Sequence, residues 1–164
     1  MLRAPADLAC RVLYRIGYRL ARQWWRLRRP SHVGALVAVW APGARLLTVR
    51  QSYRGEWTLP GGGVRAGEAP RAAAARELDE ELGLVVDARC LILALEVAGI
   101  WDYRRERVHV FELRLPRDPA IRPDGREVVE ARLVDRAALA GLRLTPPAAA
   151  YVASLRGLRA GPRG

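Results

Sequence analysis

Three glutamates near the middle of the chain have the spacing needed to act together. Glu77, Glu80 and Glu81 stand at positions i, i+3 and i+4, so on a helix they share one face and their carboxylates are expected to converge. Carboxylates without counter-charge repel one another, whereas Mg²⁺ and Mn²⁺ prefer oxygen ligands. The spacing therefore predicts a divalent-metal site, provided that these residues form a helix.

A glycine-rich segment and a basic residue accompany the glutamates. Residues 61–63 are all glycine and follow Pro60, so we expect a loop whose backbone can come close to a metal or a phosphate. Arg76 is expected to pair with Glu68 and thereby fix the loop on the helix. This combination suits phosphoryl chemistry, in which cations offset the charge of a diphosphate and make a bound water nucleophilic.

The helix that must carry the glutamates is the clearest element of the sequence, and we expect it over residues 70–82. Pro70 suits a first helical turn, the alanines at 72–75 favour helix, and Gly83 can supply a left-handed C-terminal cap. The other predicted elements surround this helix in the chain. Strands are expected at 32–40, 45–50, 57–59, within 84–98, at 108–115 and at 128–134, and helices at 6–29 and 145–158. This order predicts an α/β fold with a mixed sheet and helices packed on it.

The segment from Gly62 to Leu84 resembles the Nudix box, whose pattern is G-x5-E-x7-R-E-U-x-E-E-x-G-U with U an aliphatic residue. Every fixed position is met, by Gly62, Glu68, Arg76, Glu77, Leu78, Glu80, Glu81, Gly83 and Leu84. Nine constrained positions make this far more specific than a lone glycine motif. The resemblance implies a Nudix-type α/β/α sandwich that hydrolyses a nucleoside diphosphate linked to another moiety, with Mg²⁺ or Mn²⁺ as cofactor.

The same resemblance implies roles for single residues. Glu77, Glu80 and Glu81 would bind the metal, with the Gly61 carbonyl as a further ligand. Arg76 and Glu68 would form the orienting pair beside Gly62. The general base varies within the family, between a box glutamate and a glutamate on a late loop or strand. Here Glu127, after a Pro-Asp-Gly turn, is the first candidate outside the box and Glu130 the second.

Contacts to the rest of the substrate are predicted from residue type alone. Arg50 and Arg54 flank the expected mouth of the site and could hold phosphate oxygens. Tyr53, Trp57, Trp101 and Tyr103 could stack on a base or a sugar, and a loop is expected at residues 100–107. The alternative for each of these residues is an ordinary surface or core position.

The strong basicity of the chain belongs to its ends. The net charge is +11, but residues 1–30 hold eight arginines against one acidic residue, and residues 156–164 add three more arginines. The middle of the chain is nearly neutral, which makes a nucleic-acid partner unlikely and favours a nucleotide-type small molecule. Two cysteines give no disulfide framework or zinc pattern. No bilayer-spanning or signal segment is seen, so a cytoplasmic location is expected, with peripheral contact at the inner membrane face as a further option.

Residues 6–29 are predicted to form an amphipathic N-terminal helix within a segment, 1–30, that precedes the domain at 31–158 and the basic tail at 159–164. Leu8, Val12, Ile16, Leu20 and Trp24 recur every four residues, with arginines on an adjoining arc. Three uses are open: packing of the apolar face on the domain or on a second subunit in a homodimer, contact with an anionic membrane, and binding of nucleic acid.

Three substrate classes and one non-enzymatic function remain open at the level of the sequence. Sugar nucleotides and similar compounds are the first expectation, nucleoside triphosphates, including oxidised ones, the second, and RNA 5′ ends the third. A Nudix-fold module that only binds a nucleotide or partner is the alternative to an enzyme.

Overall fold

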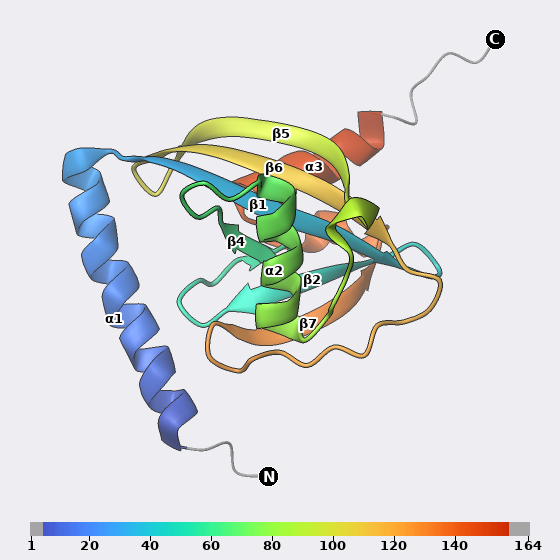
Figure 1. Ribbon diagram of the computed structural model, residues 1–164, viewed down its shortest axis with the longest axis horizontal. Coiled ribbons are helices and arrows are strands. Elements are labelled where there is room, and N and C mark those ends of the chain that lie inside the picture. The colour runs from blue at the N-terminus through green and yellow to red at the C-terminus, as the bar shows by residue number, and fades with distance from the viewer. Residues whose placement is uncertain (1–4, 158–164) are drawn as a thin grey trace.

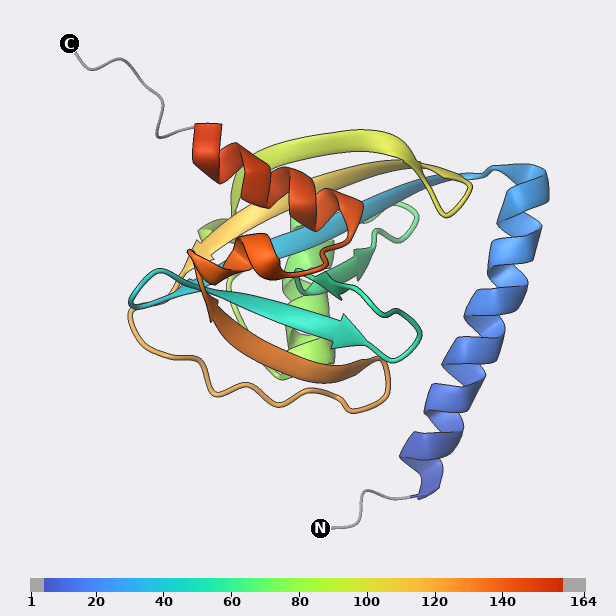
Figure 2. The same ribbon diagram turned by 180° about the vertical axis from the view of Figure 1, so that it is seen from behind.

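The computed structural model describes residues 5–157 and contains a mixed sheet between helices. The elements in chain order are α1 (Pro5–Arg28), β1 (Ser31–Ala41), β2 (Arg45–Gln51), β3 (Trp57–Thr58), β4 (Gly61–Gly63), α2 (Pro70–Leu82), η1 (Ala88–Cys90), β5 (Ile92–Trp101), β6 (Arg104–Arg114), β7 (Val128–Asp135), η2 (Ala138–Gly141) and α3 (Pro146–Gly157). Figures 1 and 2 show α2 on one face of the strands and α3 on the other. The predicted α/β/α sandwich is therefore confirmed, and the basic tail at 159–164 lies outside the described residues.

Strand β1 organises the sheet. The strand order is β3-β2-β1-β6-β5, with β4 paired to β1 and β7 paired to β2. β1 runs parallel to β6 over ten residue pairs and antiparallel to β2 and β4. A strand with neighbours on both sides and helices on both faces has no solvated side, which explains the nearly continuous apolar sequence of β1.

Two hydrophobic clusters fill the sandwich, one on each face of the sheet. Ala35, Val37 and Val39 of β1 pack with the cluster that contains the buried side of α2. Ala38 and Trp40 point to the other face and pack with the cluster that contains α3. This alternation along a strand places each helix against its own half of the core.

The packing of helix α2 against the sheet fixes the position of the glutamates that it carries. Ala73, Ala74, Leu78 and Leu82 are fully buried against the sheet. Gly83 ends the helix in the left-handed conformation (φ 63°) and donates its N–H to the Asp79 carbonyl at 2.8 Å. The bounds and both ends of this helix agree with the sequence prediction.

Two segments that were predicted as loops form β-structure. Gly61–Gly63 forms β4, because its backbone pairs antiparallel with Gly34–Leu36 of β1 and so needs no side chains to hold it in the sheet. The expected loop at 100–107 is the tip of the β5–β6 hairpin. Only Asp102 and Tyr103 turn, both with positive φ (48° and 66°), which is typical of a two-residue hairpin turn.

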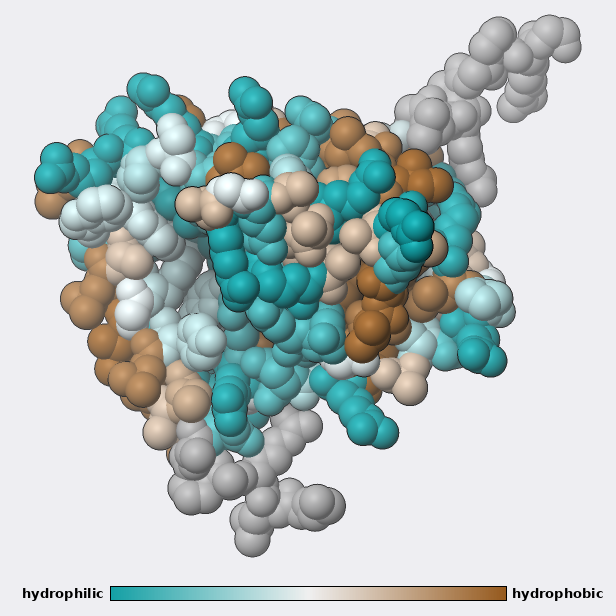
Figure 3. Space-filling view, viewed as in Figure 1, coloured by the Kyte–Doolittle hydropathy of each residue, from teal (hydrophilic) through white to brown (hydrophobic). Residues whose placement is uncertain are grey.

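Helix α1 stands beside the sandwich, and its apolar residues face away from it. Leu8 and Leu20 are 65% and 67% exposed, and Figure 3 shows the apolar side chains of α1 along the outer edge of the molecule. The prediction that this face packs on the domain is therefore wrong for the single chain. Its burial against a second copy or a membrane stays a prediction. None of the helices within residues 5–157 is long and apolar enough to cross a bilayer.

The opposite face of α1 contacts the domain through polar and aromatic side chains. Arg11, Arg15, Tyr18, Arg22 and Trp25 follow the three- and four-residue spacing of one helix face. Arg11 donates to the Gly125 carbonyl at 2.7 Å and Arg15 to the Ser52 carbonyl at 2.9 Å. These hydrogen bonds hold the polar and aromatic face of α1 against the domain.

Candidate active site

Glu81 occupies the interior of the site. Its side chain is only 4% exposed, and one carboxylate oxygen accepts a hydrogen bond from the Gly61 N–H at 2.9 Å. The other oxygen, Oε1, is buried without a hydrogen-bond partner in the protein. Burial raises the pKa of Glu81 well above its usual range, and the neighbouring carboxylates of Glu127 and Glu77 raise it further. A buried carboxylate with a free oxygen is costly unless it serves a ligand.

The glycines of β4 are required because other groups come too close. A Cβ on Gly61 would lie 2.2 Å from the Ala35 carbonyl oxygen, and Gly61 has a φ of 134° that other residues rarely adopt. A Cβ on Gly62 would lie 2.7 Å from Cδ of Glu77. Strand β4 therefore brings a bare backbone against the carboxylates of α2.

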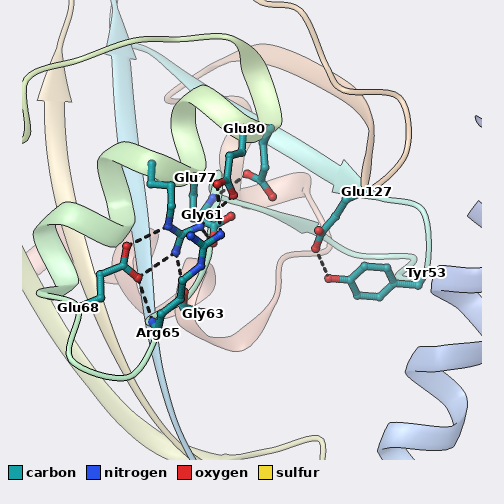
Figure 4. Close-up of polar contacts among 10 residues, drawn as sticks. Tyr53, Gly61, Gly63, Arg65, Glu68, Glu77, Glu80 and Glu127 are labelled. Atoms are coloured by element: carbon teal, nitrogen blue, oxygen red, sulfur yellow. Dashed lines mark hydrogen bonds and ion pairs between the residues drawn. The ribbon is translucent and has the colours of Figure 1, made fainter. Parts of the chain in front are cut away.

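Arg76 gathers three of the acidic side chains around one guanidinium group. It contacts Glu68 at 2.9 Å, Glu77 at 2.8 Å and Glu80 at 2.9 Å, and it donates to the Gly63 carbonyl at 3.1 Å (Figure 4). The predicted pair of Arg76 with Glu68 is confirmed. The hydrogen bonds from Arg76 lower the pKa of Glu68 to about 2, so this carboxylate stays ionised.

The three box glutamates converge less than their spacing suggests. Glu77 and Glu81 lie against β4, whereas the Glu80 side chain is 50% exposed and pairs with Arg76 and Arg65. Within residues 5–157, no three His, Cys, Asp or Glu side chains lie close enough together to hold a metal ion. In this arrangement the Arg76 guanidinium sits among the carboxylates of Glu68, Glu77 and Glu80.

Glu127 faces the box from the loop that precedes β7. Its Oε1 accepts a hydrogen bond from the Tyr53 hydroxyl at 2.8 Å, and Figure 4 shows Tyr53 lying between Glu127 and α1. Burial raises the pKa of Glu127, and the charges of Glu77 and Glu80 add to this effect, whereas the Tyr53 hydrogen bond lowers it. The second candidate base, Glu130, instead forms ion pairs with Arg50 (2.7 Å) and Arg132.

The carboxylate chemistry of the site suits a hard divalent cation. Glu81 is buried and Glu77 and Glu127 are partly buried; the pKa values of all three are raised, and nearby carboxylates contribute to each rise. Oε1 of Glu81 accepts no hydrogen bond from the protein and is therefore available as an oxygen ligand. A cation among oxygen donors relieves both the repulsion and the unmet hydrogen-bonding capacity.

The chain also matches a known family over most of its length. The NUDIX domain model covers residues 30–155. The chain belongs to the Nudix family.

Individual relatives of this Nudix chain are similar over different lengths. A protein of two Mycobacterium tuberculosis strains, named "Putative 8-oxo-dGTP diphosphatase 2", is 72% identical over 32 residues, which is 20% of this chain and 23% of that protein. The MutT protein of Methanosarcina mazei Go1 has a TM-score of 0.69 at 20% identity, over 81% of this chain and 98% of that one. The Nudix hydrolase RenU of M. smegmatis has a TM-score of 0.59 at 29% identity, over 80% and 86%. The structural matches cover about four fifths of this chain, whereas the curated match spans less than a quarter of its relative.

Two cavities meet at Tyr53 and Glu127 of the Nudix domain. The more polar of the two, here called the polar cavity, has a volume of about 220 Å³ and reaches from the β4 glycines to Arg104 and Glu106 on β6. A more open, mostly apolar one of about 450 Å³ lies between α1 and Tyr53. Tyr18 of α1 lines both cavities together with Tyr53 and Glu127, so Glu127 is reached from two sides.

The predicted substrate contacts divide into two groups. Tyr53, Arg54 and Trp101 line the polar cavity. Arg50 is held by Glu130 and lies over the Trp57 ring, while Tyr103 lies beneath Arg22 and Arg26 at the hairpin tip. Neither Arg50 nor Tyr103 lines this cavity within the described part of the chain, because ion pairs and cation–π contacts engage them elsewhere.

Several residues at the cavity were not predicted from the sequence. Tyr18 and Trp25 come from α1, His32 from the start of β1, and Arg104 and Glu106 from β6. The alternation of Arg104 and Glu106 is the signal that could have found the last two, because alternate residues of a strand face one side. It was hidden by the expectation of a loop at 100–107.

Proposed function

We propose that this protein is a hydrolase that uses a divalent cation, Mg²⁺ or Mn²⁺, to cleave the diphosphate bond of a nucleoside diphosphate linked to another moiety. The observation that carries the proposal is the buried Glu81, whose free carboxylate oxygen lies beside the bare backbone of β4. Glu77 and Glu127 add two partly buried carboxylates whose pKa values are raised. An arrangement this costly to fold is typical of a site built for a charged ligand.

The roles of the residues follow from their positions. Glu77, Glu80 and Glu81, with the Gly61 carbonyl, would hold the cation, and Glu80 would then exchange part of its contact with Arg76 for it. The cation would offset the charge of the diphosphate and make a bound water more acidic. Glu127 would take the proton from that water as its oxygen bonds to phosphorus and the bridging P–O bond breaks. Tyr53 would hold Glu127 in place.

The two cavities support a substrate with a group on each side of the diphosphate. The polar cavity suits a group with hydrogen-bonding edges, and the larger cavity, lined by Leu13, Gly17 and Ala21 of α1, suits a less polar one. Because Glu127 borders both, the reacting bond would lie between them. This arrangement favours a nucleoside diphosphate joined to a second moiety.

A nucleoside triphosphate is the second candidate substrate. It is favoured by the 72% identity over 32 residues to the protein named as an 8-oxo-dGTP diphosphatase. In that case the larger cavity would hold no part of the substrate, and compounds with and without a second moiety would be hydrolysed alike.

The test is phosphate-product release from a panel of nucleoside diphosphate sugars, dinucleotides, nucleoside triphosphates and 5′-triphosphate RNA. Each compound is assayed with Mg²⁺, with Mn²⁺ and with a chelator, for the full chain and for Glu81→Gln. We expect metal-dependent turnover of the diphosphate-linked compounds that is lost in the variant. Turnover that persists in Glu81→Gln, or none with any compound, would contradict the proposal.

A further inference from the structure

The polar cavity is closed on one side by a helix that lies outside the matched Nudix domain. Tyr18 and Trp25 of α1 line it opposite the β4 glycines, while the family match begins at residue 30. Tyr18 donates to Asp102 at 2.5 Å, and Asp102 also pairs with Arg54 at 2.7 Å and Arg22 at 3.4 Å. The tip of the β5–β6 hairpin thus holds α1 over the cavity.

Aromatic rings form the walls of this cavity. The rings of Tyr18 and Trp25 meet edge to face with their centroids 5.9 Å apart. Trp101 reaches the cavity from β5, where Gly99 leaves room for its ring: a Cβ on Gly99 would lie 2.5 Å from it. Arg104 lies over the Trp25 ring at 4.0 Å. Flat apolar surfaces next to a cationic side chain suit a planar, electron-rich ring system.

Polar groups with unused hydrogen-bonding capacity lie between these walls. Arg104 and Glu106 form an ion pair on β6, yet Nε of Arg104 is buried and has no acceptor. Nδ1 of His32 is also buried without a partner. Buried polar atoms normally find partners, so two unmatched ones lining a single cavity point to a ligand that supplies them.

We propose that this cavity binds the nucleobase of the substrate, with α1 as one wall, and that Arg104 and Glu106 select a guanine-type base. The inference rests on the proposed function and names the ring system that this site would recognise. The cavity, at about 220 Å³, is smaller than the roughly 300–1,000 Å³ of typical ligand sites, so it holds one part of a substrate.

The hydrogen-bonding pattern decides between the bases. A carboxylate accepts two adjacent N–H groups, and guanine offers a ring N–H beside an exocyclic amino group. The carbonyl and N7 of guanine accept from an arginine. Adenine, by contrast, presents an acceptor where guanine presents the ring N–H and a C–H where guanine presents the amino group, so it would leave Glu106 without either donor.

The experiment measures the binding of GMP, AMP, CMP and UMP to the full chain by titration calorimetry in the presence of a chelator. We expect GMP to bind at least about tenfold more tightly than the other three. Glu106→Gln should remove this preference, since the amide replaces one acceptor by a donor. Tyr18→Ala and Trp25→Ala should each weaken GMP binding about tenfold through the loss of a ring, whereas Tyr18→Phe and Trp25→Phe should keep most of the affinity.

Leu20→Ala on the outer face of α1 is the matched control and should bind GMP as the unchanged chain does. Equal affinities for the four monophosphates would overturn the guanine assignment. Unchanged GMP binding in folded Tyr18→Ala and Trp25→Ala would overturn the placement against α1. These titrations need no turnover, so base selectivity without hydrolysis would reject the proposed function alone, and hydrolysis without base selectivity would reject this inference alone.

Discussion

Helices α1 and α2 both border the candidate active site, but different forces hold them there. The inward residues of α2, such as Leu78 and Leu82, are fully buried in the core. Helix α1 instead turns Leu8 and Leu20 to the outside and contacts the domain through hydrogen bonds, ion pairs and tyrosine rings. Under the proposed function, α2 serves the fold and the chemistry together, whereas α1 serves mainly the site.

The energetic consequence follows from the kinds of contact. A partly exposed hydrogen bond contributes only about 0.5–1.5 kcal/mol, whereas a buried leucine contributes about 1.5–3 kcal/mol by its burial alone. Changes in α2 should therefore affect both stability and rate. Changes on the inward face of α1 should affect substrate binding with little loss of stability.

The largest effect is expected at the carboxylates of α2. Glu77→Gln keeps the shape of the side chain but removes the charge opposite β4, so kcat should fall by about two orders of magnitude or more while the fold persists. Glu96→Gln, on the half-exposed Glu96 of β5, is the matched control and should keep its rate. Steady-state kinetics with thermal melts of both variants would check this, and near-normal turnover of Glu77→Gln would contradict the assignment.

The next effect concerns stability and separates the two helices. Leu78→Ala in α2 should lower the free energy of unfolding by about 2–5 kcal/mol, because it leaves a cavity in a packed core. Leu20→Ala in α1 should change it by less than about 0.5 kcal/mol, because Leu20 is 67% exposed. Urea unfolding of both variants measures the difference. A comparable loss in both would mean that the outer face of α1 is buried in solution.

A smaller effect is expected where α1 reaches the chemistry through Tyr53. The Tyr53 hydroxyl donates to Glu127 and lowers the pKa of this carboxyl, and the Tyr53 ring contacts Tyr18 at a centroid distance of 4.8 Å. Tyr53→Phe keeps the ring and removes the donor, so the pKa of Glu127 should rise. Since a base must be ionised, the acid limb of the kcat/KM profile should then move to higher pH. An unmoved limb would exclude Glu127 as the general base.

The smallest effect is expected from the titration of His32, which lies at the start of β1. Burial and the charge of Arg104 lower the pKa of His32 to about 4, from an ordinary value of 6.5. Between these values the unfolded chain takes up a proton that the folded chain refuses, so stability should fall as the pH drops from 6.5 towards 4. His32→Gln should flatten this dependence in urea unfolding at pH 7 and pH 5. The same slope in both proteins would place the cause elsewhere.

The position and ends of α2 were predicted well from the sequence, whereas the docked face of α1 was not. The alanines, Pro70 and Gly83 define α2 locally, and the spacing of its glutamates follows from helix geometry alone. The pairing of Gly61–Gly63 with β1 could not be predicted, because backbone hydrogen bonds between distant segments leave no mark on three glycines. The docked face of α1 was missed for a related reason: its partners, Tyr53 and Asp102, lie far away in the chain, so periodicity alone pointed to the apolar face.

The most direct test of the central claim, that the α2 carboxylates and β4 form a divalent-metal site, is Mn²⁺ binding followed by electron paramagnetic resonance of the free ion. The full chain should bind Mn²⁺ with an affinity that Glu81→Gln and Glu77→Gln strongly reduce and that Glu96→Gln leaves unchanged. Equal Mn²⁺ binding by all four proteins, each shown to be folded by its circular dichroism spectrum, would contradict the account. It would place any metal site elsewhere in the chain.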